Sequence, residues 1–341
     1  MMIAGLSDRR ILPLALTLLA LPLTDFVLPQ SLQITSLMCP VLIYGLVALG
    51  LTVATGFTGL LHLGVCAFIA IGAYSFAILT CPIYPFQLPW VVAVALSAVI
   101  GALTGVALAI PTIRLRGDYL AIVTLGFGEI VQDVLRNVDS VTKGSQGINP
   151  LRGPYILGYQ YSGETPVAWY YLIALFVIIV MVALDRIIQS PIGRSWKALR
   201  DDELVASCMG VDPVSIKLVT FAVSAALCAV AGALAASLLG SSGEPSTYDF
   251  QVSIMALSMV IVGGLGSIPG AVVGAILMMG INSIVLAKLA DMASSASSTS
   301  SNVLLVPGNW KYLIFGVALV LMMRFKSDGI MPPQRNTQGE R

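Results

Sequence analysis

Long apolar stretches are the feature that most constrains the fold of this 341-residue chain. Positions 89–110 contain no charged residue, and neither do positions 168–184. About 18 or more consecutive apolar residues are typical of a membrane-spanning helix, whereas a water-soluble domain has about 25% charged residues. This chain is 57% hydrophobic and 10% charged, which leaves too few polar residues to cover a water-soluble core. The sequence therefore predicts an all-α polytopic membrane protein.

We expect ten spans, within a single transmembrane domain that covers residues 1–341. The N-terminal segment resembles a signal peptide, but no small-x-small cleavage site follows it, so we interpret it as the first span. The other spans are expected near residues 36–55, 62–80, 89–110, 118–137, 168–188, 217–240, 251–266, 270–288 and 310–324.

The basic residues predict the orientation, because Lys and Arg are enriched in cytoplasmic loops. With the N-terminus inside, only five of the 18 basic residues lie outside, namely Arg136, Lys143, Arg152, Lys288 and Lys311. An even number of spans places both termini in the cytoplasm. Periplasmic loops are then expected at about 138–167 and 289–309, and a cytoplasmic tail at 325–341. The alternating residues 155–163 predict a short hairpin in the first of these loops.

A charged patch in the cytoplasmic loop at about 190–216 stands out from its apolar surroundings. Its sequence, GRSWKALRDDELVASCMG at 193–210, has basic residues first and acidic residues after them. One continuous helix is possible, but two short helices fit better, since bases stabilise helix C-termini and acids stabilise N-termini. Asp201 is a possible N-cap of the second helix, and Gly210 is its expected end.

The patch is either a solvated loop that only fixes the topology or a docking element for a cytoplasmic partner. Docking is favoured by Trp196 and Met209, which we expect to be exposed and which would then need a partner to cover them. The residues assigned to the docking element are Gly193, Arg194, Trp196, Arg200, Asp202, Glu203, Ala206 and Gly210.

Three segments resemble the permease subunits of branched-chain amino acid ABC importers, the LivM type. They are TGLLHLGVCAFIAIGAY at 58–74, RLRGDYLAIVTLGFGEIV at 114–131 and SMVIVGGLGSIPGAVVGAIL at 258–277. The resemblance covers roughly residues 36–330. In the charged patch, Ala206 and Gly210 match the Glu-Ala-Ala-x-x-x-Gly coupling loop of importer permeases, and Glu203 lies one residue too far upstream.

The resemblance implies a permease in the bacterial inner membrane, surrounded by lipid, with a homologous second permease, two cytoplasmic ATPases and a periplasmic solute-binding protein. It implies import of leucine, isoleucine or valine by alternating access, with ATP and Mg bound by the ATPases and no cofactor in this chain. The charged patch would be where an ATPase binds. Two alternatives remain open. One is the same architecture importing urea or short amides, and the other is an ion-coupled secondary transporter.

The sequence contains no motif for catalysis. It lacks the GxxxxGK[ST] phosphate loop, so we do not expect this chain to hydrolyse ATP, and it lacks HExxH and a Ser-His-Asp arrangement. The single histidine, His62, and five scattered cysteines give no metal-site spacing. We expect His62 to lie at the membrane interface. A net charge of +1 without a basic patch gives no indication of nucleic-acid binding.

Glu129 is the main candidate for the translocation path. It lies about ten residues into its span, which places it near the bilayer midplane at ~1.5 Å per residue. A carboxylate there costs about 2.5–3.5 kcal/mol unless it faces a cavity or a partner. It therefore either forms a hydrogen bond within the bundle or lines the path, flanked by Gly126 and Gly128. Gly56 and Gly59, at a span end, are further candidates because broken helices offer backbone groups to polar ligands.

Glycines at four-residue spacing predict close helix packing rather than ligand binding. They are Gly266, Gly270 and Gly274, and also Gly101 and Gly105.

Overall fold

The computed structural model describes residues 10–22, 34–113, 115, 117–151, 153–156, 159–160, 166–280 and some residues between 316 and 332. Within these ranges the regular secondary structure is helical apart from one small hairpin, which confirms the all-α class. The hairpin pairs β1 (Tyr155–Ile156) antiparallel to β2 (Tyr159–Gln160), as the alternating residues at 155–163 predict.

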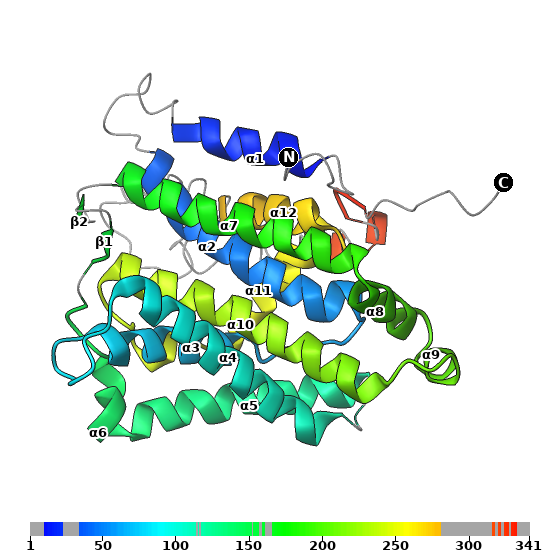
Figure 1. The fold of residues 1–341 in the computed structure, drawn as a ribbon, viewed down its shortest axis with the longest axis horizontal. Helices are drawn as coiled ribbons and strands as arrows, with labels where there is room; N and C mark the ends of the chain where they lie inside the picture. The colour runs from blue at the N-terminus through cyan, green and yellow to red at the C-terminus, as the bar shows by residue number, and fades with distance from the viewer. Residues whose placement is uncertain are drawn as a thin grey trace, which may run out of the picture.

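The helices follow one another in the order shown in Figure 1. They are α1 (Ile11–Ala20), α2 (Ile34–Leu51), α3 (Val65–Thr80), α4 (Trp90–Thr112), α5 (Asp118–Asn137), α6 (Asp139–Thr142), α7 (Pro166–Gln189), α8 (Pro191–Asp201), α9 (Glu203–Cys208), α10 (Pro213–Leu239), α11 (Phe250–Gly263) and α12 (Ile268–Gly280). A π-helical turn, η3 (Thr52–Phe57), continues α2, and two 3-10 turns are η4 (Gly144–Gln146) and η5 (Pro245–Thr247).

Five helical segments in the described part are long and apolar enough to cross a membrane. They are Thr35–Phe57, Trp90–Thr112, Pro166–Gln189, Pro213–Leu239 and Pro245–Gly263. Ile11–Ala20, Val65–Thr80 and Ile268–Gly280 are shorter apolar helices. The chain is thus a multi-pass membrane protein. The count of ten spans and the cytoplasmic termini stay predictions, and most of the span expected at 310–324 lies outside the described residues.

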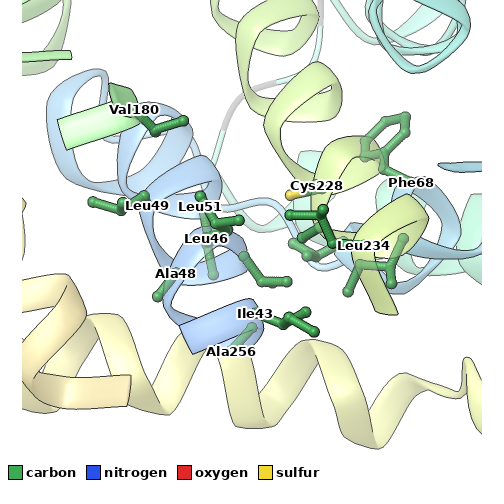
Figure 2. Packing of buried hydrophobic residues seen from close by; sticks show 14 of the residues in the cluster. Ile43, Leu46, Ala48, Leu49, Leu51, Phe68, Val180, Cys228, Leu234 and Ala256 are labelled. Carbon is green, nitrogen blue, oxygen red and sulfur yellow. The ribbon is translucent and has the colours of Figure 1, made fainter. Parts of the chain in front are cut away.

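Helix α2 forms the centre of the bundle. It packs against α10, α12 and α7, and its buried leucines meet side chains from several helices in Figure 2, where Leu234 and Cys228 come from α10 and Phe68 from α3. Figure 1 shows α8 and α9 at one end of the bundle and the β1–β2 hairpin at the opposite end. The charged patch and the first expected periplasmic loop therefore lie at opposite ends, as the predicted topology requires.

In a membrane the hydrophobic effect does not drive helices together, so their association depends on close van der Waals packing. Small residues at the crossing points allow this close approach. In α12, a Cβ added at Gly270 would lie 2.6 Å from the carbonyl oxygen of Gly263 in α11, and one added at Gly274 would lie 2.8 Å from the Gly263 nitrogen. The predicted packing role of Gly270 and Gly274 is therefore confirmed. Gly266 lies in the turn between α11 and α12 with φ +84°, and its close approach is to the backbone of Gly56 in η3 and not within a pair of helices.

Candidate functional site

The charged patch folds as two short helices, α8 and α9, as the arrangement of its charges predicts. Asp201 is the last residue of α8, and Asp202 is the N-cap of α9, so the predicted cap is wrong by one residue. Asp202 has extended backbone, and its carboxylate accepts hydrogen bonds from the N–H groups of Leu204 (2.8 Å) and Val205 (3.1 Å). These two donors have no partner inside the helix, and the cap satisfies them.

Gly210 ends α9 as predicted. Its φ of +85° is a left-handed conformation that residues with a Cβ rarely adopt, and it turns the chain back after the helix. The N–H of Val211 then donates to the carbonyl oxygen of Ala206 (3.1 Å), which satisfies one of the free carbonyls at the helix end.

Trp196 is fully buried, so the prediction that it is exposed for docking is wrong. Gly193, Trp196 and Leu199 recur every three residues and form one buried face of α8, which packs on the end of the bundle. The Trp196 ring stacks on Phe57 of η3, with ring centroids 6.2 Å apart and an interplanar angle of 5°. Trp196 therefore anchors α8 to the membrane helices.

Helix α9 carries the exposed apolar side chains instead. Leu204, Val205 and Met209 are 67%, 56% and 80% exposed, which confirms the prediction for Met209. These three residues form what we call the α9 outer face. Ala206 is buried on the opposite side of α9. The patch is thus an anchored helix followed by a helix that presents apolar side chains outward.

Arg200 joins residues for which the sequence predicts three different roles. Its Nη1 donates a hydrogen bond to the carbonyl oxygen of Gly56 in η3. Gly56 in turn touches the α11–α12 turn so closely that an added Cβ would lie 2.8 Å from the nitrogen of Gly266. A Cβ added at Gly59 would lie 3.4 Å from Cγ of Arg200. Docking element, path candidates and packing glycine therefore meet at one place.

Glu203 forms an ion pair that the sequence analysis missed. Its Oε1 lies 2.9 Å from Nζ of Lys217, whose side chain is 4% exposed, compared with 26% for Glu203. The same Nζ donates to the carbonyl oxygen of Ile113 just after α4 (3.3 Å). The available signal was Lys217 itself, a cation at the start of an otherwise apolar span. This pair ties α9 to α10 and to the end of α4.

Asp212 caps the helix that follows the patch. The Ser215 hydroxyl and the N–H groups of Val214 and Ser215 donate to its carboxylate and hold the pKa of Asp212 below its ordinary value. The start of α10 is therefore fixed by a charged cap, five residues before Lys217.

Helix α5 lies at the edge of the bundle in Figure 1, and Glu129 is on its exposed face. The buried face of α5 consists of Leu120, Thr124, Gly128, Gln132 and Leu135. Among the described residues we find no hydrogen bond to the Glu129 carboxylate, so the alternative of a hydrogen bond within this bundle is not supported. Gly128 packs against Cys66, since a Cβ added at Gly128 would lie 3.0 Å from the Cys66 Sγ. A Cβ added at Gly126 would meet open space.

His62 is buried within the bundle, and its expected position at the membrane interface stays a prediction. Its ring packs between Phe68 of α3 and Phe221 of α10, each with a centroid 5.3 Å away. Neither ring nitrogen has a hydrogen-bond partner within the described part of the chain.

Comparison with known proteins identifies the family. The family described as "Branched-chain amino acid transport system / permease component" matches residues 33–323. The chain is 33% identical over 315 residues to the high-affinity branched-chain amino acid transport system permease protein LivM of Salmonella typhimurium, covering 86% of this chain and 69% of that protein. It is 25% identical over 243 residues to a probable LivM of Methanocaldococcus jannaschii, covering 71% of this chain and 68% of that protein.

A second group of relatives has a different name. The chain is 28% identical over 149 residues to the permease protein LivH of Escherichia coli, covering 42% of this chain and 48% of that protein. No solved structure matches. The family matches residues 33–323, and the 33% identity to LivM extends over most of both chains. The chain therefore belongs to the permease components of branched-chain amino acid transport systems.

Proposed function

We propose that this chain is a membrane-spanning permease subunit of an ABC importer that translocates leucine, isoleucine and valine. The observation that carries the proposal is the α8–α9 hairpin, in which one helix is anchored to the bundle and the next exposes an apolar face. A large apolar surface rimmed by charges is typical of a protein-binding site. The similarity to LivM over 86% of the chain supports the choice of solute.

The α9 outer face binds one of two cytoplasmic ATPase subunits, which hold ATP and Mg. The names of the relatives include two related permeases, LivM and LivH, and a homologous second permease completes the membrane domain. A periplasmic binding protein delivers the amino acid from the opposite end of the bundle. The complex lies in the inner membrane.

The exposed face of α5 forms one wall of the translocation path. Apolar side chains such as Ile122, Ile130 and Val134 are exposed on α5 together with Glu129. A branched-chain amino acid has an aliphatic side chain and two opposite charges, so its path needs mostly apolar walls with a few polar groups. A carboxylate at membrane depth is stable when it faces a partner or a water-filled cavity, and the second permease provides both.

The first test is the composition of the complex. We expect the tagged chain, extracted gently from its own membrane, to copurify in fixed stoichiometry with two ATPases and a second permease, identified by mass spectrometry. The periplasmic binding protein of the same importer should then bind leucine and not urea. A chain that purifies alone, or only with itself, would contradict the importer assignment and favour ion-driven transport.

Glu129→Gln should lower leucine uptake by about tenfold, because a charge-assisted contact contributes about 1.5 kcal/mol. Uptake by the reconstituted complex measures this effect. Asp118→Asn, an exposed carboxylate at the start of the same helix, is the matched control and should transport normally. Equal uptake by wild type and Glu129→Gln would exclude Glu129 from the path.

A further inference from the structure

We infer that the segment Thr52–Gly64, which joins α2 to α3, transmits the movement of the α8–α9 hairpin to α5, and that Arg200 is the residue that positions it. This inference rests on the proposed importer function. It adds a specific route through the membrane domain, built from contacts between α8, the 52–64 segment and α5.

The first half of the 52–64 segment is a π-helical turn, η3, with all six residues buried. The hydroxyls of Thr52, Thr55 and Thr58 each donate to the carbonyl oxygen four residues earlier, at 2.7, 2.9 and 2.7 Å. Such back-bonding bends helices, and π-helical turns occur frequently at functional sites. After η3 the chain has no regular helix until Val65. The segment is therefore a break between two membrane helices, where backbone rearrangement costs least.

Helix α8 holds this break at two adjacent residues. Trp196 stacks on Phe57, and Arg200, one turn further along α8, donates to the carbonyl oxygen of Gly56. The two side chains lie on the same side of α8 because residues four apart are neighbours on a helix. A shift of α8 must therefore move the end of η3 or break both contacts.

The far end of the segment is attached to α5. The N–H of Leu63 donates to Oγ1 of Thr124 (3.0 Å), and Gly64 lies so close that an added Cβ would overlap the Thr124 carbonyl oxygen. Thr124 is on the buried face of α5, five residues before Glu129. The segment thus connects α8 directly to the helix that carries the proposed path residue.

Three buried side chains in or near the segment, those of His62, Ser224 and Trp196, have polar atoms without a hydrogen-bond partner among the described residues, as expected if the segment has a second arrangement. His62, within the segment, is buried with both ring nitrogens unpartnered, and so is the hydroxyl of Ser224 on α10, in each case among the described residues. Phe221, which touches the His62 ring, precedes Ser224 by three residues and so shares a face of α10 with it. Buried polar groups are nearly always hydrogen-bonded, so a shift of the segment that brings His62 to Ser224 would satisfy both groups.

The test measures coupling and not stability. The complete importer, with both permeases, the ATPases and the binding protein, is reconstituted in vesicles, and leucine uptake and ATP hydrolysis are measured in the same preparation. Arg200→Ala should lower the leucine transported per ATP by at least about tenfold while hydrolysis continues. Arg200→Lys, which keeps a donor for the Gly56 carbonyl, should recover part of the ratio. Lys197→Ala, at an exposed position of the same helix and outside the residues assigned to docking, is the control and should leave the ratio unchanged.

A normal ratio for Arg200→Ala, or an equal loss for Lys197→Ala, would overturn the inference. If the wild-type complex itself shows no ATP-driven leucine uptake, the proposed function fails instead, so the two failures are distinguishable.

A second measurement keeps the test decisive if Arg200→Ala assembles poorly. Cys208 is the exposed cysteine and the other four are buried, so a Cys208→Ser chain gives a silent background for thiol labelling. Leu61→Cys in this background places a thiol at an exposed position of the segment. Its reaction rate with a soluble maleimide should change several-fold when the reconstituted importer is locked in its ATP-bound state, and an unchanged rate would overturn the inference.

Discussion

Gly72→Ala should destabilise the folded chain by about 2 kcal/mol, although alanine is the better helix former by about 1 kcal/mol. Gly72 lies where α3 crosses α10. An added Cβ would overlap the carbonyl oxygen and Cα of Ala229 and lie 2.6 Å from its carbonyl carbon. These atoms are backbone, so no side-chain rotation relieves the overlap and the two helices must separate. Separation also loosens the reciprocal contact, in which Gly232 of α10 touches the Ile69 carbonyl oxygen.

The measurement is the thermal unfolding midpoint of the purified chain in detergent, which should fall by on the order of 5 °C. Gly45→Ala in α2 is the matched control, because an added Cβ there would meet only Cβ of Ala275, at an ordinary distance of 4.0 Å. This control should be unchanged or slightly more stable. Equal midpoints for the two variants would mean that the α3–α10 crossing tolerates a wider separation than its geometry indicates.

This crossing also shows how far the sequence predicts the fold. The four-residue spacing of Gly270 and Gly274 correctly predicts close packing of α12, because the signal lies within one helix. Gly72 and Gly232 are isolated glycines on helices far apart in the sequence, and only the crossing geometry pairs them. Gly266 shares the four-residue spacing but lies in the turn before α12 and packs on Gly56 of η3, a partner that spacing within one segment cannot identify.

The sequence predicts the local features of the candidate site but not its long-range contacts. Charge order along the patch predicts two helices, and it places the break within one residue of Asp202. Trp196 was expected in water because the patch joins two spans. Its three-residue spacing from Gly193 and Leu199 is the signal that would have indicated a buried face. For Glu129 the sequence predicts the depth but not the direction, because α5 has apolar residues on both its buried and its exposed face.

The contact of Arg200 with Gly56 joins segments more than a hundred residues apart. No local pattern in the chain encodes that contact, since an arginine in a charged patch is equally suited to water. The sequence identifies both residues as candidates but for separate roles. Their meeting is a property of how α8 packs against the π-helical end of α2.

Glu203→Gln should destabilise the chain by about 2 kcal/mol, because it leaves the buried Lys217 ammonium without its counter-charge. Breaking a fully buried ion pair costs about 3–5 kcal/mol. The loss expected for Glu203→Gln is smaller because the Glu203 side chain is 26% exposed. In addition, Lys217 keeps its hydrogen bond to the Ile113 carbonyl oxygen at 3.3 Å. The double variant Glu203→Gln with Lys217→Met removes both charges. Its free energy of unfolding should therefore lie within about 1 kcal/mol of the wild-type value, since replacing a buried ion pair by uncharged groups is often neutral.

Thermal midpoints of the two single variants and the double variant form a double-mutant cycle that isolates the pair. Asp201→Asn, an exposed carboxylate two residues away, is the control and should change the midpoint little.

The same variants distinguish a role of the ion pair in positioning α9 from a role in stability alone. If the pair holds α9 at the angle required by the ATPase that we propose binds it, the double variant folds normally but transports less leucine per ATP. Stability losses that simply add in the double variant would show that Glu203 and Lys217 act independently, and α9 would then depend on its Asp202 cap and Ala206 packing alone.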